Sequence, residues 1–154
     1  MSVFEQIRSN QVLVSACLGW LVAQILKTLI DMWATGSFKL ERMYGNGGMP
    51  SSHSATVCAM VTSALFAYGI GSFEFAVSFI FALVVMIDAM GVRRETGKQA
   101  KLLNMMMEQD FWNFDDPAVL EKRLKEFVGH TPLQVLVGAI LGIIIACITE
   151  YVAF

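Results

Sequence analysis

The residues best suited to chemistry lie in a short run that ends in a histidine, Gly47-Gly48-Met49-Pro50-Ser51-Ser52-His53. Glycine lets the backbone approach a ligand closely, and Ser51 or Ser52 is suited to cap a following helix. The first turn of a helix presents free N–H groups and the positive end of the helix dipole, which together favour an anion. We therefore expect Gly48, Ser51 and Ser52 to cradle a phosphate, with His53 placed to protonate a leaving oxygen. The alternative is a serine cap with a purely structural histidine.

The second histidine, His130, lies in Gly129-His130-Thr131-Pro132, just before the last apolar stretch. One imidazole of such a pair can attack phosphorus and form a phosphohistidine, while the other protonates the leaving alcohol. Cationic side chains would neutralise the phosphoryl oxygens. The candidates on the same side are Lys27, Arg42, Arg93 and Arg94. The pattern predicts phosphoryl transfer without a metal or other cofactor, because no cluster of carboxylates or Cys/His ligands accompanies it.

Two ionisable residues, Lys27 and Asp88, lie inside or at the end of apolar stretches. A charge there is costly and suggests a function by default. Lys27 precedes Asp31 by one helical turn, so a structural ion pair is the alternative for this lysine. An interfacial charge cluster with the arginines that follow is the alternative for Asp88.

The elements that position these residues follow from the composition. The 154-residue chain is 56% hydrophobic and 16% charged, with a mean hydropathy of +0.60. A chain this short cannot bury so much apolar surface in one aqueous core. Its charge-poor stretches predict four membrane-spanning helices. They cover about 11–33, 52–70, 73–91 and 132–153.

We therefore predict an all-α integral-membrane helical bundle. A single domain, residues 1–154, would hold an insertion at about 94–128 with one or two short helices outside the membrane. The turn at residues 69–72 predicts an antiparallel hairpin of the second and third spans. Gly138 and Gly142 form a Gly-x-x-x-Gly pattern that permits close helix packing.

Other classes of protein are disfavoured. A net charge of −2 and a pI near 5.6 leave no basic surface for nucleic acid. Cys17, Cys58 and Cys147 are too few and too scattered for a disulfide framework or a zinc site. We expect them to be small buried hydrophobic residues.

The two long connections, residues 34–51 and 92–131, should lie on one side of the membrane and carry most of the Lys and Arg residues. The positive-inside rule then places them, and the candidate site, in the cytoplasm. An anion-binding role for the same residues would weaken that inference.

These motifs resemble a known family. Pro50-Ser51-Ser52-His53 is similar to the Pro-Ser-Gly-His motif of type-2 phosphatidic acid phosphatases, which share a fold and site with vanadium haloperoxidases. The longer string from Gly47 to Ala55 resembles a small divergent branch, described as acid phosphatase/vanadium-dependent haloperoxidase-related. Three further strings carry the same resemblance: residues 88–94, 97–100 and 129–132. The resemblance implies His53 as general acid and His130 as nucleophile.

The chain departs from the larger superfamily at several positions. Lys27 matches the lysine of the first motif, but Ala34 stands where that motif has an arginine, and Arg42 is the best substitute. Gln134 replaces the aspartate that orients the nucleophilic histidine, and Asp88 could compensate. Arg93 is displaced from the third motif by the insertion. Four spans, where superfamily members usually have six core helices, suggest a reduced bundle or completion by a homodimer.

Two functions follow from these observations. The first is an integral-membrane phosphatase of a phosphorylated lipid, a phosphomonoester or diphosphate of a glycerolipid or isoprenoid, in a bacterial plasma membrane or an organelle membrane. The second is a non-catalytic membrane protein that binds an anionic lipid headgroup, as a transporter component or scaffold. A soluble vanadate haloperoxidase is disfavoured by the hydropathy.

Overall fold

The computed structural model describes residues 2–37, 48–108 and 129–153, and every regular element in this part of the chain is a helix. The helices are α1 (Val3–Ser9), α2 (Gln11–Thr35), α4 (Ser52–Tyr68), α5 (Phe73–Met90), α6 (Val92–Glu108) and α8 (Pro132–Ala153). The all-α prediction is confirmed. The four apolar helices begin and end within two residues of the predicted spans.

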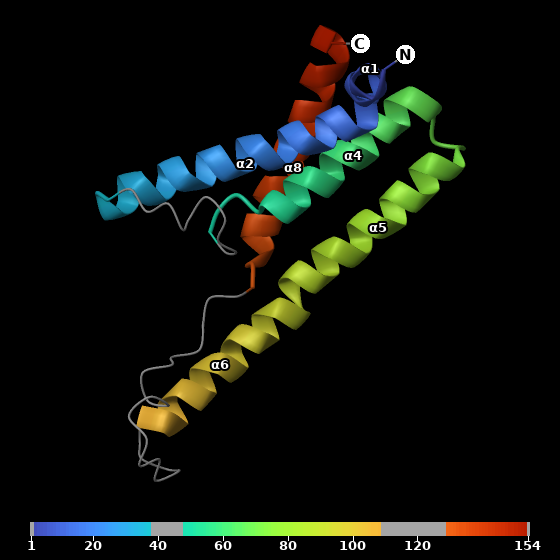
Figure 1. The fold of residues 1–154 in the computed structure, drawn as a ribbon. Helices are drawn as coiled ribbons and strands as arrows, with labels where there is room; N and C mark the ends of the chain where they lie inside the picture. Colours follow the sequence, from blue (N-terminus) through green and yellow to red (C-terminus); the bar gives the residue numbers. More distant parts are fainter. Residues whose placement is uncertain (1, 38–47, 109–128, 154) are drawn as a thin grey trace.

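Helix α4 is the centre of the bundle and packs against α2, α5 and α8. In Figure 1 it lies between α2 and α5, while α8 crosses behind it. The close packing depends on glycines. A Cβ atom at Gly142 of α8 would collide with the backbone of Ala55. A Cβ atom at Gly19 of α2 would lie 2.9 Å from the carbonyl oxygen of Ala55. The Gly-x-x-x-Gly pattern of α8 therefore does mediate close helix packing, as predicted.

The interior of the bundle consists of small side chains, and the large apolar side chains point outward. Ala23, Ala55 and Ala59 are completely buried, whereas many Leu, Ile, Val and Phe side chains of α2, α5 and α8 are exposed. This is the reverse of a water-soluble core and fits a surface solvated by lipid. Helices α2 and α8, and α5 together with α6, are long and apolar enough to cross a membrane. Helix α4 has 17 residues, about 25 Å at ~1.5 Å per residue, so the count of four spans stays a prediction.

The α4–α5 hairpin forms as the sequence predicts. Gly69 ends α4 with a φ of +80°, and the backbone N–H of Ser72 donates to its carbonyl oxygen at 3.2 Å. Ser72 then caps α5 by accepting from the N–H of Phe75 at 3.1 Å. Gly69 is one of the positions where left-handed backbone makes glycine the natural residue.

Two features differ from the sequence-based expectations. Residues 3–9 form α1, capped by the reciprocal hydrogen bonds of Ser2 and Glu5, although the sequence suggested only a polar N-terminal end. Cys17 and Cys147 are exposed on the outer faces of their helices and not buried as expected, and Cys58 is half-buried. Outward-facing cysteines are compatible with lipid contact because the thiol is a weakly polar group.

The predicted insertion at about 94–128 lies partly outside the described residues. Its first part belongs to α6, which continues from α5 past Gly91 and extends beyond the bundle in Figure 1. The continuation depends on the backbone N–H of Glu95, which donates to the carbonyl oxygen of Gly91 at 3.0 Å. Residues 109–128 lie outside the described residues.

Candidate functional site

The start of α4 forms the first wall of the candidate site. Ser51 is the N-cap, and its hydroxyl oxygen accepts from the backbone N–H of Ser54 at 3.3 Å. Ser54 also donates its own hydroxyl to Ser51 Oγ at 3.1 Å, and both serines are fully buried. The N–H groups of Ser52 and His53 belong to the first turn of α4, where the helix itself provides no acceptor. The predicted capping is confirmed, and His53 lies in the first turn of α4.

The start of α8 forms the opposite wall and is organised by a capping box. The Thr131 hydroxyl accepts from the N–H of Gln134 at 3.3 Å, and the Gln134 side-chain oxygen accepts from the N–H of Thr131 at 3.0 Å. The same oxygen, Oε1, lies 3.3 Å from Nδ1 of His130. An amide oxygen only accepts, so this contact is a hydrogen bond when Nδ1 of His130 carries the proton. In the neutral ring of that tautomer, the lone pair is on Nε2.

The two walls are joined through the backbone. The N–H of Ser51 donates to the carbonyl oxygen of Gln134 at 3.1 Å, and the N–H of His130 donates to the carbonyl oxygen of Ala89 at 3.0 Å. A Cβ atom at Gly138 would collide with the carbonyl oxygen of Ser51, so α8 lies directly on the start of α4. The beginnings of α4 and α8 and the end of α5 therefore meet at one end of the bundle.

The two histidines meet at this point. The ring centroids of His53 and His130 are 5.7 Å apart, with an angle of 63° between the ring planes. His130 is buried, at 3% exposed, and His53 is half-buried. They are far apart in the sequence, and the packing of α8 on α4 brings them within reach of one small ligand.

Lys27 reaches the same region from α2. A Cβ atom at Gly48 would lie 3.1 Å from Cγ and 3.2 Å from Cδ of Lys27, so the lysine stem packs on the glycine backbone. Gly48 has a φ of +89°, which only glycine adopts without strain. Lys27 is 4% exposed. The glycine-rich segment before α4 is therefore in direct contact with a buried cationic side chain.

The structure describes the remaining predicted site residues less completely. Asp88 is half-buried in the last turn of α5, beside Ala89, whose carbonyl oxygen accepts from His130. Arg93 and Arg94 lie in the first turn of α6, but their side chains are outside the described part of the structure. Arg42 lies outside the described residues altogether. Ser51 uses its backbone N–H and its hydroxyl within the protein, which makes it a support for the cradle.

A cavity of about 380 Å³ opens beside His53 and contains residues that the sequence analysis did not select. Gln24 and Thr56 are its additional polar lining residues, and Trp20 and Phe81 line its sides. The side-chain oxygen of Gln24 is buried and has no hydrogen-bond partner among the described residues. A glutamine inside an apolar span was the available sequence signal, because polar groups within a membrane helix are costly.

The residues at this end of the bundle are of the types that can bind an anion. They are a helix N-terminus, a buried lysine and two imidazoles, one of which contacts the side-chain oxygen of Gln134 through Nδ1. Among the described residues, no three His, Cys, Asp or Glu side chains gather in a way that would hold a metal ion.

Fold and site define an integral-membrane helical bundle with a histidine pair at one end. A family model described as "Divergent PAP2 family" matches residues 8–145, and the chain belongs to that family. It is 37% identical over 155 residues to the "Uncharacterized membrane protein YuiD" of Bacillus subtilis (strain 168), covering 95% of this chain and 98% of that protein. No solved structure shows a significant match to the chain.

Proposed function

We propose that the protein is a metal-independent phosphatase of a membrane lipid phosphate. The observation that carries the proposal is the approach of His53 and His130, 5.7 Å between ring centroids, at the start of α4. Lys27 packs on Gly48, a few residues before this helix. Membership of a family related to type-2 phosphatidic acid phosphatases supports the same chemistry.

In the proposed reaction, Nε2 of His130 attacks phosphorus and forms a phosphohistidine. The bond between phosphorus and the lipid oxygen breaks, and His53 gives its proton to that oxygen, so the lipid leaves as an alcohol. A water molecule then attacks the phosphohistidine, with His53 accepting its proton. The products are inorganic phosphate and regenerated His130. Lys27 and the amides at the start of α4 would stabilise the charge on the phosphoryl oxygens.

The test is phosphate release by the purified full chain from a panel of lipid phosphates in detergent. Wild type should release phosphate and be inhibited by vanadate, which mimics pentacoordinate phosphorus. His130→Ala should lose release and the labelled phosphoenzyme, while His53→Ala should release the lipid alcohol more slowly. Full release by folded His130→Ala would reject the mechanism.

One observation favours a second function, the binding of an anionic lipid headgroup without catalysis. The partner of His130 Nδ1 is the neutral amide of Gln134, which cannot stabilise an imidazolium by charge. Saturable binding of lipid phosphates without phosphate release or a phosphoenzyme would favour this function over the phosphatase.

Location and assembly belong to the same proposal. The count of Lys and Arg in the two long connections supports a cytoplasmic position for the histidine pair. The membrane would be a bacterial plasma membrane or an organelle membrane. A homodimer would complete a bundle with fewer helices than its superfamily usually has.

A further inference from the structure

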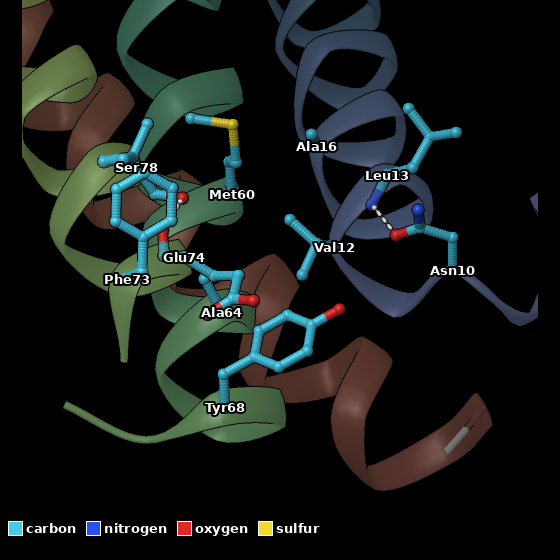
Figure 2. Close-up of a pocket in the computed structure, with 11 residues that line it drawn as sticks. Asn10, Val12, Leu13, Ala16, Met60, Ala64, Tyr68, Phe73, Glu74 and Ser78 are labelled. Atoms are coloured by element: carbon cyan, nitrogen blue, oxygen red, sulfur yellow. Dashed lines mark hydrogen bonds between the residues drawn. The ribbon is translucent and has the colours of Figure 1, made fainter. Parts of the chain in front are cut away.

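Two hollows lie between α2, α4 and α5. The near one, about 380 Å³, includes Ser52 and His53 of the candidate site. The far one, about 410 Å³, is lined by the beginnings of α2 and α5 and the second half of α4. Figure 2 shows this far hollow, with side chains from all three helices around one space. Each volume falls within the roughly 300–1,000 Å³ typical of ligand pockets.

The two hollows lie end to end along α4. On α4, Val57 lines the near hollow and Met60 the far one. On α2, Trp20 lines the near hollow and Ala16 the far one. On α5, Phe81 lines the near hollow and Val77 the far one. Residues three or four positions apart are neighbours on a helix surface, so each pair joins the hollows on one wall. We call the combined space the α4 groove.

The α4 groove is mostly apolar between its two ends, and buried residues form its floor. Val57, Ala64 and Ala16 are buried beneath it, with 4%, 1% and 8% of their surface exposed. Trp20 and Phe81 form its sides near His53, and both are also exposed to the outside. Both hollows are open at the surface of the bundle, so a hydrocarbon chain can enter from the side.

The length of the groove identifies the kind of chain that fits. It follows α4 from Ser52 to Tyr68, about 25 Å at ~1.5 Å per residue. The hydrocarbon core of a bilayer is ~30 Å thick, so the tails of a glycerolipid fill only about half of it. At the far end, Asn10 and Glu74 provide the polar surface expected near the opposite membrane face.

We propose that the α4 groove binds the single hydrocarbon chain of a polyprenyl-type lipid phosphate, longer than one leaflet, with its phosphate at the His53–His130 pair. The position of the headgroup rests on the proposed function. The occupant is argued from the continuity of the groove with the histidine site and from its length. A two-tailed glycerolipid would leave the far hollow unfilled.

The test places a bulky side chain in the far hollow. Val77 lines that hollow and is 50% exposed, so Val77→Trp should fill the groove without disturbing the packed face of α5. Ile80→Trp is the matched control. Ile80 lies on the same helix, is 59% exposed and is not among the residues lining either hollow.

Binding is measured by native mass spectrometry of the detergent-solubilised full chain. The probes are a long polyprenyl monophosphate and a phosphatidic acid with two acyl chains. Wild type and Ile80→Trp should retain the polyprenyl phosphate about tenfold better than phosphatidic acid, and Val77→Trp should lose about tenfold in that retention. Helical circular dichroism should be equal in all three proteins.

The outcomes separate this proposal from the proposed function. Equal retention of both lipids, or unchanged retention by Val77→Trp, overturns the groove proposal. So does a dimer that Val77→Trp dissociates, because a second copy would then occupy the groove. Phosphate release is followed in parallel. Selective binding without phosphate release rejects the phosphatase and keeps the groove proposal. Phosphate release that depends neither on the chain length of the lipid nor on Val77→Trp keeps the phosphatase and rejects the groove proposal.

Discussion

The side-chain oxygen of Gln134 accepts hydrogen bonds from two donors, the backbone N–H of Thr131 at 3.0 Å and the imidazole of His130 at 3.3 Å. One residue thus caps the start of α8 and orients a buried histidine. The first bond determines where α8 begins, and the second determines which ring nitrogen of His130 keeps its lone pair. Both roles require an acceptor at this position, but neither requires a charge.

Gln134→Glu should therefore keep the geometry and strengthen catalysis. A glutamate at this position still completes the capping box. Its charge would strengthen the hydrogen bond to an imidazolium by roughly 1 kcal/mol, so we expect kcat to rise by about fivefold when chemistry is rate-limiting. Single-turnover phosphate release measures this. Gln134→Leu, which removes the acceptor, should lower the rate, and a Leu variant as fast as wild type would contradict the role assigned to the amide.

Lys27→Met should weaken the binding of phosphate in the candidate site. Lys27 is buried against Gly48, and loss of one charge-stabilising group from such a site costs about a hundredfold. The measurements are kcat/KM and the inhibition constant of vanadate. Lys98→Met is the control, because Lys98 forms an exposed ion pair with Glu95 on α6. Equal effects of the two substitutions would show that Lys27 contributes only to the overall charge of the protein and does not bind the phosphate in the site.

Gly48→Ala should disturb the site beyond its effect on stability. Alanine at a positive φ costs roughly 1–2 kcal/mol, and the added Cβ would also press on the stem of Lys27. Gly36→Ala is the matched control, since Gly36 has a φ of +66° but no neighbouring atom within 4 Å of the added Cβ. Both variants should have a lower Tm, and only Gly48→Ala should lower kcat/KM. A similar loss of activity in both would assign the effect to backbone strain alone.

Gly142→Ala should destabilise the packing of α8 on α4. The added Cβ collides with the carbonyl oxygen of Ala55 and would lie 2.9 Å from the N of Ala59. Overpacking of this kind costs typically 1–3 kcal/mol. Thermal unfolding in detergent, followed by circular dichroism, should show a lower Tm. Gly71→Ala, where the added Cβ meets nothing within 4 Å, should leave the Tm unchanged. An unchanged Tm in both would mean that α8 shifts away at little cost.

Local chemistry made several elements predictable. The helix after Ser51, the turn at Gly69 and the start of α8 at Pro132 each depend on residues within a few positions of one another. The apolar stretches predicted the long helices because the membrane demands a minimum length of apolar residues. α1 was missed because its capping box lies in a short polar segment without a clear apolar period.

The sequence by itself determined the all-α membrane architecture, the helix starts that present His53 and His130, and the scarcity of charge that singles out Lys27. Only the tertiary structure decided that these three residues gather at one end of the bundle. The physical reason is that their proximity depends on how α2 and α8 pack on α4 at Gly19, Gly138 and Gly142. Such contacts join residues far apart in the chain, and spacing along the sequence does not report them. The α4 groove is likewise a property of three helices together.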